Sequence, residues 1–210
     1  MRVTRVAVAV MVAGAVVAGC SGMRGGGKPK AMVAREGVLT RGETLQYVGV
    51  DFRRTVFFDP YLKYDDAVHG KIPSWSSHAL EDASLKFPMP LSTDFGIVDD
   101  LNKKVSEKQF VTIAPDPAKW PLNDDAVRKE IAPWVGKKQS GHALLIVAEQ
   151  LSKPSGVVAH YVVFDRATGE IVILDQMVGK VGGFGPHNFY LNGLKDVAGH
   201  ARDTIASLVR

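Results

Sequence analysis

The most reactive side chain in this sequence is a single thiol, and its position is unusual. Cys20 is the only cysteine among the 210 residues, and it directly follows an apolar stretch, VAVAVMVAGAVVAG (residues 6–19). Arg2 and Arg5 precede that stretch. A short positive segment followed by about 12 apolar residues is typical of a signal peptide, whereas a membrane-spanning helix needs roughly 20. Because sulfur is a good nucleophile, Cys20 is suited to covalent modification where such a peptide ends.

The residues Val17-Ala18-Gly19-Cys20 resemble the lipobox of bacterial lipoproteins. The resemblance implies that the Cys20 sulfur receives diacylglycerol, that residues 1–19 are removed, and that the new amino terminus is acylated. Such an anchor holds a domain on a membrane without a spanning segment. Ser21, in place of aspartate after the cysteine, implies export to the outer membrane of a two-membrane bacterium. The alternative is a free cysteine buried in an N-terminal core helix.

Removal of the signal peptide changes the charge and the length that remain to be explained. The formal charge falls from +4 to +2, because Arg2 and Arg5 leave with residues 1–19. No Lys/Arg cluster points to nucleic acid. The glycine-rich sequence after Cys20 is typical of a flexible tether, which we place at residues 20–42. Residues 43–210 then suffice for one domain with its own core, and an acylated Cys20 leaves no thiol for a disulfide.

A glycine-rich segment, GKVGGFGPHN (residues 179–188), is the strongest candidate for a binding loop. Its backbone N–H groups could meet an anion or a partner beside the start of a helix. The candidate residues are Lys180, Gly182, Gly183, Gly185 and His187. The alternative is a tight connection whose glycines allow positive φ, with Phe184 packed inward and Asn188 capping the helix.

The other residues capable of chemistry lack the spacing that catalysis or metal binding needs. The histidines show no HxxxH, HExxH or HxH pattern, so we expect no metal site and no cofactor. They are His69, His78, His142, His160, His187 and His200. We interpret His160 as a half-buried sheet residue and His200 as lying off the apolar side of the final helix.

Serine and aspartate patterns have plain structural interpretations. Ser77 precedes His78, and adjacency on a helix does not favour a catalytic hydrogen bond. We expect a helix start there, with Ser74 or Ser76 as its cap and Leu80 and Ala83 facing the core. The aspartate pairs are typical of first-turn or solvated charges. They are Asp65-Asp66, Asp99-Asp100 and Asp124-Asp125.

Alternation and spacing predict the first half of the fold. Residues 45–52 alternate as a strand does, and Ile97, Leu101 and Val105 have helical spacing. We expect a short strand at 110–113 and then a proline-rich loop at 115–121. The next helix opens at Asn123, and its face is formed by Val127, Ile131 and Trp134.

The second half of the chain carries the clearest signals. Residues 143–149 are nearly continuous in apolar side chains, which is typical of a buried strand. Residues 157–165 and 169–176 flank a turn and predict a β-hairpin, with positive φ at Gly169. An apolar stripe predicts a C-terminal helix that packs on the sheet: Leu194, Val197, Ala198, Ala201, Ile205 and Leu208. The predicted fold class is α/β, with α+β possible: a single mixed sheet with packed helices.

Two further resemblances concern the domain. The FDRATGEIV hairpin and closing helix, within residues 140–210, are similar to periplasmic domains of the curli-secretion channel family. They also resemble lipoprotein activators of peptidoglycan synthases and the amino-terminal domain of the Tol-system translocation protein. The segments YVGVDF, Pro73-Ser74-Trp75 and GKVGGFGPHNFYLNGL resemble uncharacterised lipoproteins of the Bacteroidetes type.

Together these patterns favour a membrane-anchored envelope lipoprotein whose domain is a non-enzymatic module for binding or assembly. Its expected partner is an envelope protein or polymer. One alternative is an envelope hydrolase with a site built from His69, His78, His142 and an acidic residue. Another alternative is a sensor that binds a small anion at the 182–188 loop.

Overall fold

The structure is a computed structural model that describes residues 33–81, 86–113 and 124–209. The predictions for the signal peptide, Cys20, Ala83, the proline-rich loop and Asn123 lie outside these residues. Within these residues, seven strands form one mixed sheet in the order β1-β7-β6-β5-β2-β4, and β3 also pairs with β5. The predicted fold class, a single mixed sheet with packed helices, is therefore confirmed.

The long strands lie at the centre of the sheet and the short ones at its edges. Pairing is antiparallel for β1–β7, β5–β6 and β6–β7, and parallel for β2–β4, β2–β5 and β3–β5. The strands are β1 (Val33–Ala34), β2 (Leu45–Asp51), β3 (Val56–Phe58), β4 (Leu91–Thr93), β5 (His142–Ser152), β6 (Gly156–Asp165) and β7 (Ile171–Gly179). The predicted hairpin is β6–β7, and Gly169 in its turn has a φ of 73°.

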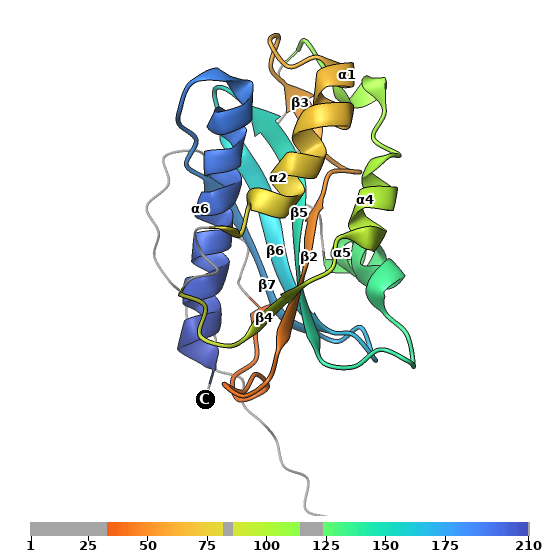
Figure 1. The fold of residues 1–210 in the computed structure, drawn as a ribbon, viewed down its shortest axis with the longest axis vertical. Helices are drawn as coiled ribbons and strands as arrows, with labels where there is room; N and C mark the ends of the chain where they lie inside the picture. The colour runs from red at the N-terminus through yellow and green to blue at the C-terminus, as the bar shows by residue number, and fades with distance from the viewer. Residues whose placement is uncertain (1–32, 82–85, 114–123, 210) are drawn as a thin grey trace, which may run out of the picture.

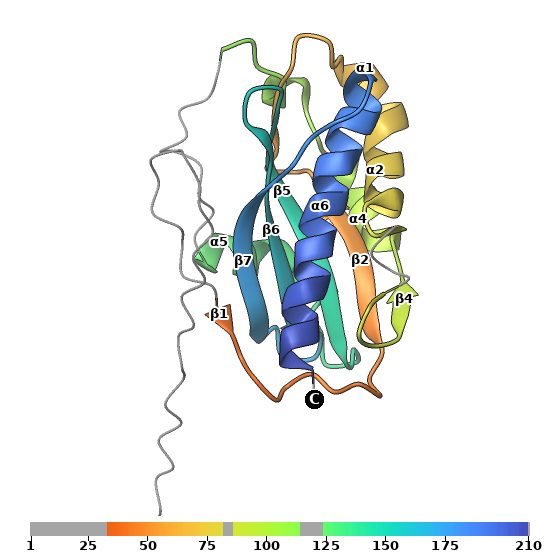
Figure 2. The same cartoon turned by 90° about the vertical axis from the view of Figure 1, so that its left-hand side faces the viewer.

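Helices cover both faces of the sheet, with α2 and α6 on one face and α4 and α5 on the other (Figures 1 and 2). The α-helices are α1 (Tyr64–Asp66), α2 (Ile72–His78), α4 (Gly96–Asn102), α5 (Asp124–Ile131) and α6 (Gly185–Leu208). Short segments of other helix types are also present: the π-helix η1 (Ala67–Lys71) and the 3-10 helices η2 (Glu107–Gln109) and η4 (Ala132–Trp134). None of the described helices is both long enough and apolar enough to span a bilayer.

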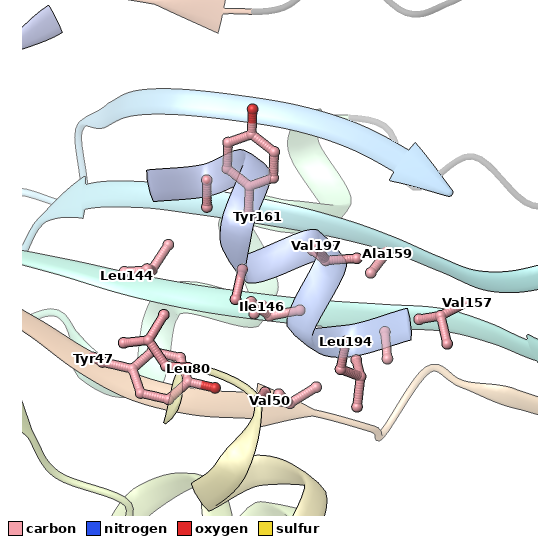
Figure 3. Packing of buried hydrophobic residues seen from close by; sticks show 14 of the residues in the cluster. Tyr47, Val50, Leu80, Leu144, Ile146, Val157, Ala159, Tyr161, Leu194 and Val197 are labelled. Carbon is pink, nitrogen blue, oxygen red and sulfur yellow. The ribbon is translucent and has the colours of Figure 1, made fainter. Parts of the chain in front are cut away.

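The C-terminal helix packs on the sheet as its apolar stripe predicts. Every residue of that stripe is buried, and Figure 3 shows Leu194 and Val197 beside Ile146 and Ala159 of the sheet. Two glycines let the backbones approach each other. A Cβ on Gly179 would lie 2.1 Å from the Gly193 carbonyl oxygen, and one on Gly193 would lie 2.6 Å from Val157 Cγ2. The helix can therefore dock this closely only because both positions are glycine.

The opposite face has a smaller apolar core, and a side chain there forms hydrogen bonds with the backbone at the end of β2. Val127, Ile131 and Trp134 pack there against β5 and β6, as their spacing predicts. Beyond β4, the edge of β2 meets Asn102 of α4. The Asn102 amide accepts a hydrogen bond from the Phe52 N–H (2.8 Å) and donates one to the Val50 carbonyl (2.9 Å).

Two local predictions were wrong. Residues 110–113 form no strand, because only an isolated bridge between Phe57 and Phe110 is made there. The folded part also begins before residue 43, since β1 pairs with β7 and Leu39 is fully buried. Only the start of the 110–113 segment packs on the domain, where Phe110 stacks on Phe57 with ring centroids 4.3 Å apart, while Ile113 is exposed.

Candidate functional site

An open pocket of about 630 Å³ lies at the end of the sheet where β7 leads into α6. We call it the aromatic pocket. It is lined by Tyr61, Lys153, Gly183, Phe184, Gly185, Pro186 and Phe189. Three segments distant in sequence meet here: the loop after β3, the turn between β5 and β6, and the loop between β7 and α6. This is the upper end of the molecule in Figure 1, opposite the C-terminus.

The rim of the aromatic pocket consists of exposed aromatic rings and one cation. Phe184 is 96% exposed and Tyr61 is 68% exposed. The Lys153 ammonium lies 4.2 Å from the centre of the Tyr61 ring, which is a cation–π contact. The pocket therefore offers apolar surface and a positive charge to whatever binds it.

A buried carboxylate fixes the two sides of the pocket relative to each other. One oxygen of Asp59 accepts a hydrogen bond from the Tyr61 N–H (2.9 Å), and the other accepts one from the Tyr190 hydroxyl of α6 (2.9 Å). Burial raises the pKa of Tyr190, and the hydrogen bond to Asp59 and its negative charge raise it further. The hydroxyl therefore remains a donor, and the Tyr61 loop stays tied to the helix that forms the other wall.

The first turn of α6 is anchored on α2 through Trp75. The Trp75 indole N–H donates a hydrogen bond to the His187 carbonyl (3.0 Å), and the two rings stack at a centroid distance of 6.3 Å. The imidazole thus lies against Trp75 rather than lining the pocket. Its pKa is lowered first by burial and then by the nearby charges of Lys71 and His78.

The structure brings only part of the predicted loop into the pocket. Gly183 and Gly185 line it, with φ of 101° and 78°, whereas Lys180, Gly182 and His187 do not. The Lys180 N–H donates to Asp196, and the Gly182 carbonyl accepts from Asn192, so α6 holds this loop in place.

Two details of the alternative interpretation of this loop were wrong. Phe184 points to solvent instead of packing inward, and Asn188 lies inside α6, whose N-cap is Phe184. The helix begins earlier than expected because Pro186 fits its first turn, where a missing N–H costs nothing.

The pair Ser77–His78 also departs from expectation. The Ser77 hydroxyl does lie 3.0 Å from His78 Nδ1, although the two residues are adjacent. However, Nδ1 also lies 2.8 Å from the Ser74 carbonyl, and Ser77 has the Pro73 and Ser74 carbonyls as acceptors. Ser74 and Ser76 are not caps, because α2 begins at Ile72. Leu80 is buried as predicted.

Reactive side chains do meet in a second place, which the sequence did not indicate. Glu149, His160 and Gln176 project from three neighbouring strands on the face of α4 and α5, and we call them the polar cluster. His160 Nδ1 forms an ion pair with Glu149, and the Gln176 amide donates to the other carboxylate oxygen (3.0 Å). A β-bulge between Ala148 and Gln150 places Glu149 there.

The polar cluster is closed to solvent. His160 is 0% exposed, so it is fully rather than half buried, and Glu149 is 1% exposed. Neither ring nitrogen of His160 has a hydrogen-bond partner of normal geometry among the described atoms, although Nδ1 lies against the Glu149 carboxylate. Burying a carboxylate is costly unless polar groups surround it, and Glu149 has the His160 ring and the Gln176 amide beside it. A substrate would have no route to these groups, so the cluster serves the sheet rather than a reaction.

Some of the other ionisable groups form pairs that support the fold. Arg53 contacts both Asp51 (2.7 Å) and Glu130 (2.8 Å), joining β2 to α5. Burial lowers the Arg53 pKa, but the hydrogen bond and charge of Asp51 and the charge of Glu130 raise it overall. His142 pairs with Glu43 at the opposite end of the sheet (2.5 Å). In the described part of the chain, no three metal-binding side chains converge.

Comparison with known proteins identifies only distant structural neighbours. No protein family and no curated protein matches the sequence. Two crystal forms of a PelC dodecamer from Paraburkholderia phytofirmans, one of them a point variant, have a similar chain course. Each is 14% identical, and the alignments cover 84% and 85% of this chain and 96% of the PelC chain. Their TM-scores of 0.36 and 0.34 are too low to support an argument about function.

Proposed function

We propose that this protein is a lipid-anchored lipoprotein of the bacterial envelope, held on the outer membrane through Cys20. Its domain acts by binding an envelope component rather than by catalysis. The observation that carries the proposal is a difference in solvent access between the polar cluster, which is buried, and the aromatic pocket. The aromatic pocket is open, and apart from Lys153 and the Tyr61 hydroxyl its lining is apolar or backbone.

The positions of the histidines support binding over hydrolysis. A hydrolase would need histidine and carboxylate at one accessible place. His142 lies at the opposite end of the sheet from the aromatic pocket, while His78 is on α2 and His69 is on η1. The Glu149–His160 pair of the polar cluster is closed to solvent, and the Glu43–His142 pair lies at the end of the sheet far from the pocket. Neither histidine–carboxylate pair lies at the aromatic pocket, so the open surface at that end of the domain suits binding.

The anchor is tested by Cys20→Ala. We expect this change to abolish acylation and to leave an uncleaved precursor at the inner membrane, because no other thiol can accept the lipid. Mass spectrometry of the mature amino terminus reads this directly. An unmodified Cys20 that still carries residues 1–19 in the parent chain would refute the anchor.

Binding through the aromatic pocket is tested in the full chain, expressed in its own envelope. Chemical crosslinking should give products with envelope components for the parent chain. The double variant Tyr61→Ser/Phe184→Ser should lose them, because both rings leave the rim. Lys138→Ala, an exposed change near the opposite end, is the matched control and should leave the products unchanged. Equal yields from all three chains would contradict the proposal.

A further inference from the structure

The aromatic pocket presents more apolar surface to solvent than a domain of this kind usually leaves open. Large aromatic side chains are mostly buried in soluble domains, yet Phe184 is 96% exposed and Tyr61 is 68% exposed. They lie at one end of the molecule, beside Lys153. Aromatic rings with a neighbouring cation are typical of the boundary between lipid and water. This composition suits a lipid surface.

The position of β1 sets the distance between the start of the described chain and the aromatic pocket. β1 runs antiparallel to β7, with Val33 opposite Leu174. β7 runs toward the aromatic pocket, and Val33 lies beside Leu174, five residue steps before the end of that strand. From Leu174 to Gly179 the strand advances roughly 17 Å. Thirteen residue steps separate Cys20 from Val33. They span at most roughly 45 Å, so an anchored Cys20 is within reach of that end.

We propose that the aromatic pocket rests on the lipid bilayer that holds Cys20, with Phe184 and Tyr61 inserted among the headgroups. This inference rests on the proposed function, because it requires the lipid anchor. The anchor and the aromatic rings act as two membrane contacts on one molecule, and the second contact fixes the orientation of the domain. The opposite end, which carries the β6–β7 turn, then faces away from the membrane.

Charge plays a smaller part in this contact than the rings do. Asp65 and Asp66 of α1 are exposed at the same end, and anionic headgroups would repel them. Lys153 can extend its ammonium to a phosphate while its aliphatic stem stays on the Tyr61 ring. We therefore expect similar contact with vesicles of phosphatidylcholine and vesicles that also contain phosphatidylglycerol.

The test uses the lipidated full chain, whose acylated Cys20 leaves no free thiol. A cysteine at Gly182 places a fluorescent probe beside the pocket, where an added Cβ meets nothing within 4 Å. Ala167→Cys, exposed in the β6–β7 turn, is the matched control. The chains are reconstituted into phosphatidylcholine vesicles, and quenching is measured with nitroxide-labelled lipid and with aqueous iodide. Mass spectrometry of the same samples verifies the acyl chains.

The expected result is that nitroxide lipid quenches the probe at 182 severalfold more than the probe at 167, while iodide shows the reverse order. Adding Tyr61→Ser and Phe184→Ser should return the probe at 182 to the behaviour of the control. Equal iodide quenching at both positions in an acylated chain would overturn the inference. Shielding at 182 only after an envelope extract is added would assign the pocket to a protein or polymer, leaving the proposed function intact. Absence of acyl chains would instead contradict the proposed function, because that function requires the lipid anchor at Cys20.

Discussion

The polar cluster and the aromatic pocket differ in both composition and access. The polar cluster contains a carboxylate and an imidazole, the groups from which acid–base sites are built. Both groups are buried on the face of the sheet that α4 and α5 cover. The aromatic pocket offers only Lys153 and the Tyr61 hydroxyl as polar side-chain groups, but it is open to solvent. Residue type alone would therefore point to the wrong place, since a binding site also needs access.

The two regions also differ in how they are supported. The polar cluster is held by three adjacent strands, so its geometry depends on the sheet itself. The aromatic pocket is built from three loops, which are fixed by Asp59, Trp75 and the start of α6. Changes in the cluster should therefore affect stability and leave binding intact. Changes at the pocket rim should do the opposite.

The largest effect is expected from Ile205→Asp, which should unfold the domain and so abolish both the polar cluster and the aromatic pocket. Ile205 is fully buried between α6 and the sheet. Truncating such a residue to alanine costs about 2–5 kcal/mol, and a buried unpaired charge adds to that. A domain of this size is typically stable by about 5–15 kcal/mol. Thermal melting followed by circular dichroism should show loss of the folded state.

Arg202→Asp is the control on the same helix. The Arg202 guanidinium bonds only to its exposed neighbour Asp203 among the contacts described, so its loss should change the melting temperature little. Similar melting temperatures for the two variants would mean that α6 does not dock as described.

Glu149→Ala should be the next most damaging change. It removes the carboxylate that lies against the buried His160 ring and accepts from Gln176, and breaking a buried pair in this way costs about 3–5 kcal/mol. Urea unfolding measures the loss. Glu43→Ala removes the partner of His142 at a more exposed position, where we expect a smaller loss. If the two variants are equally stable, the polar cluster does not have the structural role assigned to it.

Much of the fold could be predicted from the sequence because its strongest patterns are long. The stripe on α6, the hairpin around Gly169 and the buried strand at 143–149 all appear where the periodicity places them. The prediction of a strand at 110–113 was wrong, because so short a segment carries too little periodicity to distinguish a strand from a loop.

A smaller, pH-dependent effect is expected at His187. Its pKa is lowered in the folded state by burial, Lys71 and His78, so the unfolded chain takes up the proton at a higher pH. The stability that this group contributes is present above about pH 6.5 and is lost as the pH falls further. His187→Gln should therefore show a smaller drop in melting temperature between pH 7 and pH 5 than the parent chain. An identical drop in both would remove His187 as a source of the pH dependence.

The smallest effect on stability is expected from Phe184→Ser. A side chain that is 96% exposed makes few contacts within the fold, so the free energy of unfolding should change by less than about 0.5 kcal/mol. Denaturant unfolding provides the measurement. A loss as large as that of Glu149→Ala would show that Phe184 packs inward after all.

The candidate site could be predicted only in part. The glycines marked the 179–188 loop, and Gly183 and Gly185 do line the pocket. The other walls, Tyr61 and Lys153, come from segments far away in sequence, and no local pattern brings them together. The polar cluster was missed for the same reason: Glu149, His160 and Gln176 meet only through strand register.

The central claim is that the protein works through the aromatic pocket at the end of its sheet. The most direct test is photocrosslinking in living cells, with a benzophenone amino acid in place of Phe184 and, as control, in place of Ala167 in the β6–β7 turn. We predict strong adducts with membrane lipid or another envelope component from position 184, and little from position 167. Equal adduct yields at the two positions would contradict the claim.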